Sequence, residues 1–127
     1  MLRVLVVEDN RIYREAFIEN LCDHFPTSVI DVAENGEAAL KKIHAAPPQL
    51  VFIDIRLPGM NGLQLTQKIK RDFPNIHIAI VSGYDVPEYR QAALQYGAEH
   101  FFVKESLKWG EIEELVKSIE KSESATG

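Results

Sequence analysis

The residues that could carry out chemistry stand where short apolar runs end. The run 50–54 ends in the carboxylate Asp54, and the loop after it contains a proline and two glycines. A charged group is rarely buried without a partner, so we expect Asp54 to face a pocket at the mouth of a strand. Three other apolar runs also end in polar residues, which are Glu8 and Asp9, Ser82, and Lys104.

Together these side chains indicate phosphoryl chemistry. The carboxylates of Glu8, Asp9 and Asp54 would repel one another, and a hard divalent cation relieves that repulsion. Mg²⁺ fits because it takes few carboxylates and keeps water and phosphate oxygens as its other ligands. A carboxylate can attack phosphorus and form an aspartyl phosphate. Lys104 and Ser82 could then bind the phosphoryl oxygens, so we predict phosphoryl transfer onto Asp54.

A parallel sheet would bring these residues together. The sequence alternates between predicted strands and predicted helices, as such a sheet requires. Apolar residues also recur at helical spacing after each apolar run. Helices on both faces of a parallel sheet are therefore expected, with the site beyond the carboxyl ends of the strands. The predicted strands cover residues 2–7, 29–33, 50–54, 76–81 and 101–103.

Composition narrows the classes of protein. A chain of 127 residues fits one domain, here expected over residues 1–121, with a polar tail at 122–127 that frays or begins a linker. A net charge of -5 disfavours nucleic acid contact from this segment. No apolar run is long enough to span a membrane. The single Cys22, expected to pack on its helix, fits a reducing compartment, and we predict a cytoplasmic location.

Each of these residues also has an ordinary interpretation. Glu8 and Asp9 could form a solvated helix start, Asp54 could cap a turn, and Lys104 could be a surface lysine. Together these interpretations fail, because all the polar exceptions fall at the same end of the predicted sheet.

Four motifs resemble the receiver domain of response regulators in two-component signalling. The motifs occur in the order of that family, lie at predicted strand ends and are spread over nearly the whole chain. Residues 1–121 are therefore identified as a receiver domain. The motifs are Val6-Val7-Glu8-Asp9-Asn10, the loop 54–62, Ser82-Gly83 and Phe101-Phe102-Val103-Lys104.

The resemblance implies a flavodoxin-like, doubly wound five-stranded sheet of order 2-1-3-4-5. It implies that Asp54 is the phosphoacceptor and that Mg²⁺ is held by Glu8, Asp9, Asp54 and the backbone carbonyl of Arg56. It also makes Lys104 the counter-ion of the phosphoryl group.

The resemblance further implies a switch. Ser82 would move toward the new phosphoryl oxygens, and Phe101 would turn into the space that Ser82 leaves. A sensor histidine kinase would donate the phosphoryl group, and a homodimer could form on phosphorylation. The ending Lys104-Glu105-Ser106 is similar to receivers joined to helix-turn-helix domains, so the expected output is transcriptional, through a domain outside this chain.

Two other functions are compared with this one. A receiver-like interaction module working without phosphorylation would keep the fold but would not need the complete set of site residues. A phosphohydrolase with an aspartyl intermediate usually has an aspartate two residues after its nucleophile, and Arg56 stands there. Arginine cannot transfer that proton at neutral pH, so we expect a signalling switch and not an enzyme.

Overall fold

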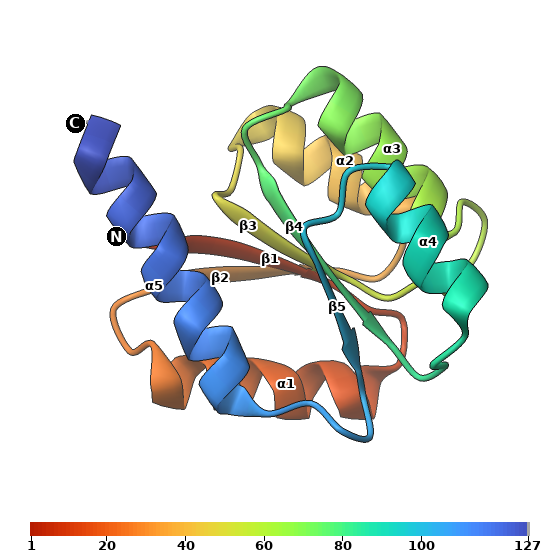
Figure 1. Cartoon of the computed structure of the whole chain (residues 1–127), viewed down its shortest axis with the longest axis horizontal. Coiled ribbons are helices and arrows are strands. Elements are labelled where there is room, and N and C mark those ends of the chain that lie inside the picture. Colours follow the sequence, from red (N-terminus) through yellow and green to blue (C-terminus); the bar gives the residue numbers. More distant parts are fainter. Residues whose placement is uncertain (127) are drawn as a thin grey trace.

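Five parallel strands form one sheet in the order β2-β1-β3-β4-β5 (Figure 1). This computed structural model describes the backbone of residues 1–126 and the side chains of residues 1–123. The predicted fold class and strand order are confirmed. The strands are β1 (Arg3–Val7), β2 (Val29–Ala33), β3 (Leu50–Ile53), β4 (His77–Ser82) and β5 (His100–Val103).

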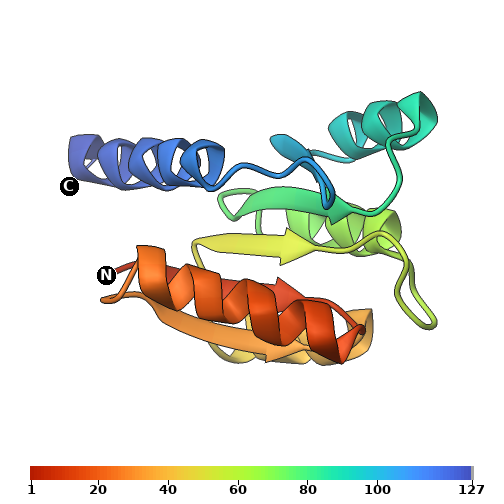
Figure 2. The same cartoon turned by 90° about the horizontal axis from the view of Figure 1, so that it is seen from below.

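Helices cover both faces of the sheet. Helices α1 and α5 pack on one face, and α2, α3 and α4 pack on the other (Figures 1 and 2). Within residues 1–126, no helix has both the length and the apolar character that a bilayer span requires. The helices are α1 (Arg11–His24), α2 (Gly36–Ala45), α3 (Gly62–Asp72), α4 (Pro87–Gln95) and α5 (Trp109–Thr126).

The sheet divides the interior into two cores because side chains alternate along each strand. In β3, Val51 and Ile53 pack toward α2, α3 and α4, whereas Leu50 and Phe52 pack toward α1 and α5. All four β3 residues are buried. Such a strand is apolar along its whole length, and the first charged residue that follows it is Asp54.

Asparagine caps fix where the helices begin after the strands. The side chains of Asn10, Asn35 and Asn61 each accept a backbone N–H from the first turn of α1, α2 and α3. Asn61 and Gln64 form a reciprocal capping box. The loops β1–α1 and β3–α3, which carry the candidate site, are therefore anchored at their helical ends.

Two expectations at the periphery turn out differently or stay open. Cys22 is exposed, so the prediction that it packs is wrong. Helix α5 continues through Thr126, into the segment 122–127 that was expected to fray or begin a linker. The domain boundary at residue 121 stays a prediction, and residue 127 lies outside the described residues.

Gly62 lets α3 begin directly against the loop that carries Asp54. Its N–H donates to the Ile55 carbonyl at 2.7 Å. A Cβ atom at position 62 would lie 2.1 Å from the Asp54 carbonyl oxygen and 2.8 Å from Ile55 Cα. Both of these atoms belong to the backbone, so no side-chain rotation can relieve the overlap.

We therefore expect Gly62→Ala to lower the free energy of unfolding by more than about 3 kcal/mol, because backbone must move to admit the methyl group. Urea unfolding followed by circular dichroism measures this change. Gly110→Ala, at a helical position with open space around it, is the matched control and should be neutral or slightly stabilising. Equal stabilities of the two variants would contradict the close contact.

Candidate functional site

The carboxyl ends of β1, β3 and β5 place the predicted residues at one edge of the sheet. The Glu8 N–H donates to the Ala33 carbonyl at 3.0 Å, and the Asp54 N–H donates to the Val7 carbonyl at 3.0 Å. The Lys104 N–H donates to the Ser82 carbonyl at 2.8 Å. Each site residue thus continues the hydrogen bonding of its strand by one position, and the sheet itself sets its backbone.

Three carboxylates gather there, as predicted. Glu8, Asp9 and Asp54 each offer an oxygen, and these oxygens lie within 4.8 Å of one another. Glu8 is 3% and Asp54 8% exposed, whereas Asp9 is open to solvent. Burial, then the charge of Glu8 and a hydrogen bond with it, raise the pKa of Asp54 to about 7. Lys104 and the Arg56 N–H act in the opposite direction.

This donor set fits Mg²⁺. All the side-chain donors are oxygens, the cluster is partly open through Asp9, and two like charges are buried side by side with an excess of negative charge. A hard cation would relieve that repulsion and could keep water ligands on its open side. The part of the Arg56 carbonyl as a further ligand stays a prediction.

Lys104 is the cation of the pocket, and it contacts Glu8 more closely than Asp54. Its Nζ lies 2.6 Å from Glu8 Oε1 and 3.5 Å from Asp54 Oδ2. The same ammonium lies 4.2 Å from the centroid of the Tyr13 ring. Tyr13 was not among the predicted site residues, so this contact was missed. An aromatic residue one turn after an acidic pair is the only signal that could have indicated it.

Arg14 is a second residue of the site that was not predicted from the sequence. Its Nη1 donates to the Glu8 carbonyl at 2.8 Å, and its Nη2 lies 3.4 Å from Glu34 Oε1. The guanidinium is largely buried, so it ties α1 to the end of β1 and to the loop after β2. Arg14 therefore holds the backbone of Glu8, while Lys104 holds its side chain.

Ser82 is fully buried, and its hydroxyl is engaged within its own turn. It accepts from the Tyr84 N–H at 3.0 Å and donates to the Tyr84 carbonyl at 3.2 Å. The Tyr84 ring in turn stacks under the Arg56 guanidinium, 4.2 Å from Cζ to the ring centroid. The loops after β3 and β4 are thus joined across the site. In this state, Ser82 is not bonded to Asp54.

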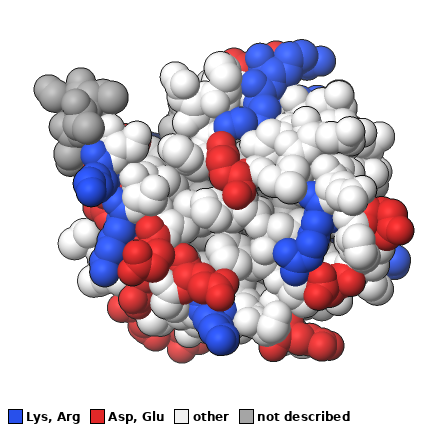
Figure 3. Space-filling view, in the orientation of Figure 1, with Lys and Arg blue, Asp and Glu red and all other residues white. Residues whose placement is uncertain are grey.

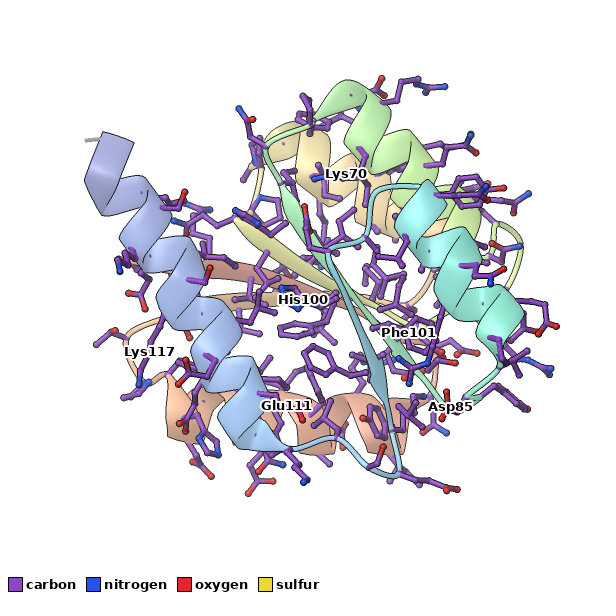
Figure 4. The ribbon with its side chains drawn as sticks, viewed as in Figure 1. Lys70, Asp85, His100, Phe101, Glu111 and Lys117 are labelled. Atoms are coloured by element: carbon purple, nitrogen blue, oxygen red, sulfur yellow. The ribbon has the colours of Figure 1, made fainter. Side chains whose placement is uncertain are left out.

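Phe101 and Phe102 point to opposite faces of β5. Phe102 is buried in the core with α5. Phe101 is half-buried on the α4 side of β5 (Figure 4), and the Arg90 guanidinium lies 4.7 Å from its ring centroid. Arg90 also pairs with Asp85 at 2.8 Å. The peptide bonds of the described residues, including Lys104–Glu105, are all trans.

Comparisons with known proteins agree with this geometry. The family model described as "response regulator receiver domain" matches residues 4–120. A solved structure of response regulator protein TrrA from Thermotoga maritima, in complex with Mg²⁺–BeF, is similar with a TM-score of 0.82 and 35% identity. That likeness covers 94% of this chain and 99% of that chain.

Curated relatives are longer than this chain. The probable transcriptional regulatory protein NarL of Mycobacterium tuberculosis (strain H37Rv) is 31% identical over 93% of this chain and 53% of its own length. The protein-glutamate methylesterase/protein-glutamine glutaminase of Geobacillus kaustophilus is 40% identical over 83% of this chain and 30% of its own length. This chain thus spans about a third to a half of these relatives. On the match across residues 4–120, together with the confirmed fold, the chain belongs to the response regulator receiver domains of two-component signalling.

Proposed function

We propose that this domain accepts a phosphoryl group on Asp54 from a sensor histidine kinase, with Mg²⁺ bound by Glu8, Asp9, Asp54 and the Arg56 carbonyl. One observation carries the proposal: the buried carboxylates of Glu8 and Asp54, the exposed carboxylate of Asp9 and the Lys104 ammonium meet at the carboxyl end of the sheet. The domain would act as a signalling switch, catalysing only its own phosphoryl transfer and slow dephosphorylation.

The residues divide the chemistry among themselves. Asp54 must be ionised for its Oδ to attack phosphorus, and its raised pKa shows that burial and Glu8 oppose ionisation. When bound, Mg²⁺ would supply the positive charge that favours the carboxylate and the developing phosphoryl oxygens. Lys104, already 3.5 Å from Asp54 Oδ2, would neutralise a further phosphoryl oxygen.

The switch would start from the two engaged side chains described above. To reach a phosphoryl oxygen, the Ser82 hydroxyl must give up its bonds to Tyr84. That exchange costs little if the new bond is to a charged acceptor, because such bonds are the stronger kind. Phe101, half-buried beside α4, would then turn inward, leaving the Arg90 guanidinium.

The output is proposed to lie outside this chain. The chain resembles only part of NarL, which is named a transcriptional regulator, and we propose transcriptional control through a DNA-binding domain, with homodimers on phosphorylation. On the face drawn in Figure 3, the lysine and arginine side chains are interspersed with acidic ones. The net charge of -5 supports the proposal that this segment makes no direct nucleic acid contact. A cytoplasmic location stays a prediction.

Removing the acceptor should abolish phosphorylation. We expect acetyl phosphate with Mg²⁺ to label the wild-type protein and to leave Asp54→Asn unlabelled, since the amide cannot serve as the nucleophile. Intact-mass spectrometry measures the label. Asp72→Asn, an exposed acid on α3, is the control and should label normally. Label on Asp54→Asn would reject Asp54 as acceptor, and an unlabelled wild-type protein would favour the phosphorylation-independent interaction module.

The raised pKa of Asp54 has a consequence for stability without metal. The folded protein holds this proton more tightly than the unfolded chain, so stability falls as pH rises from about 4, the usual value for aspartate, to about 7. Asp54→Asn removes that loss. We expect the variant to gain on the order of 1–3 kcal/mol over wild type at about pH 8 and distinctly less at about pH 5.

Urea unfolding in a chelator at the two pH values measures this difference. Asp72→Asn again serves as the control, because Arg71 lowers the pKa of that exposed acid and its neutralisation should not stabilise. A gain for Asp54→Asn that is the same at both pH values would show that the Asp54 carboxylate is not destabilised by its site.

A further inference from the structure

Tyr13 occupies a fixed place beside the acidic pocket. Its N–H donates to the side chain of Asn10 at 3.0 Å, within the cap of α1. Its ring stacks on Phe17 at 6.0 Å between centroids, and Phe17 is itself held against Phe52 at 5.0 Å and Trp109 at 5.1 Å. The Tyr13 ring is thus held by an aromatic group that reaches Phe52 in the core between the sheet and α1 and α5.

The Lys104 ammonium lies over this ring. The ammonium lies 4.2 Å from the ring centroid, inside the roughly 6 Å range of cation–π attraction. The Lys104 side chain is only 20% exposed, and poor hydration strengthens such a contact. Of the three donors of the ammonium, one is spent on Glu8 at 2.6 Å, and Asp54 lies further away at 3.5 Å.

The ring differs from the other two partners of Lys104 because it carries no charge. Burial and the charges of Glu8 and Asp54 raise the pKa of the Tyr13 hydroxyl to about 12, so the ring stays neutral at physiological pH. The carboxylate oxygens of Glu8 and Asp54 are among those that could bind a metal ion. A neutral ring does not compete for that cation and keeps its contact with the ammonium when the carboxylates are otherwise engaged.

We propose that Tyr13 is a positioning residue, whose ring face holds the Lys104 ammonium at the pocket within reach of the oxygens of phosphorylated Asp54. This rests on the proposed function. A lysine side chain is long and flexible and loses much rotamer freedom when it is fixed. The Tyr13 ring, on α1, restricts the rotamers of the Lys104 side chain. Less conformational entropy is therefore lost when the ammonium binds the phosphoryl group during transfer.

The test weakens the electrostatic attraction of the ring while keeping its shape. Position 13 is replaced by phenylalanine and by phenylalanines with increasing numbers of ring fluorines, and then by leucine. Acetyl phosphate should label Tyr13→Phe at a rate within about twofold of the wild-type rate. The rate should fall stepwise with fluorination, by about 3- to 10-fold at the end of the series and in Tyr13→Leu. Urea unfolding checks that each variant is folded.

Two controls separate positioning from packing. In a Lys104→Met background, the labelling rate should be the same for every member of the fluorine series. Phe73 is a half-buried ring on the other side of the sheet, and its fluorination should leave the labelling rate unchanged. A readout without phosphorylation is the chemical shift of the Lys104 ε-methylene protons. The ring should shift them upfield in wild type and Tyr13→Phe, and the shift should vanish in Tyr13→Leu.

The outcomes distinguish the two proposals. If Asp54 is labelled at one rate throughout the series, or if the fall persists in Lys104→Met, Tyr13 does not position the lysine, while the proposed function stands. If wild-type Asp54 takes no label, the proposed function fails and this inference fails with it. An upfield shift that is unchanged in Tyr13→Leu would also overturn the contact.

Discussion

The structure depends on the repulsion between two buried carboxylates at the end of the sheet. Glu8 and Asp54 are forced together because β1 and β3 are neighbours in register, with Val7 opposite Ile53. Both acids are buried, with Glu8 3% and Asp54 8% exposed. One ammonium, from Lys104, offsets part of this repulsion. The rest leaves the resting protein with an acid that is easily protonated and a strong demand for further positive charge.

Two side-chain contacts near these acids would have to break in the switch proposed above. The Ser82 hydroxyl is satisfied by the Tyr84 backbone, and Arg90 covers Phe101. These contacts are individually weak, about 1 kcal/mol or less for a neutral hydrogen bond or an exposed cation–π pair. A new charge at Asp54 can therefore outweigh them. The fold below does not need to change, because the hydrogen bonds of the sheet hold the backbone of each site residue.

Much of this arrangement could be predicted from the sequence. Strand ends that interrupt apolar runs with charge identified Glu8, Asp54 and Lys104, and the family resemblance supplied the strand order, which the structure confirms. What remained hidden depends on distances between elements. No sequence pattern indicates that Lys104 lies closer to Glu8 than to Asp54, or that the Tyr13 ring lies under the ammonium. Cys22 was misjudged because its neighbour Leu21 is buried while position 22 lies outside the buried stripe.

The two cores would give the proposed signal a direction. Phe101 and Phe102 are adjacent in sequence but pack in separate interiors, with the sheet as a partition between them. The rotation of Phe101 proposed above would act first on the core that contains α4, because this side chain does not enter the core that contains α1 and α5. The α4 side of the molecule would thus respond before the side that carries α1 and α5. A partner in contact with both faces of the molecule would sense their relative displacement rather than the absolute shape of either face.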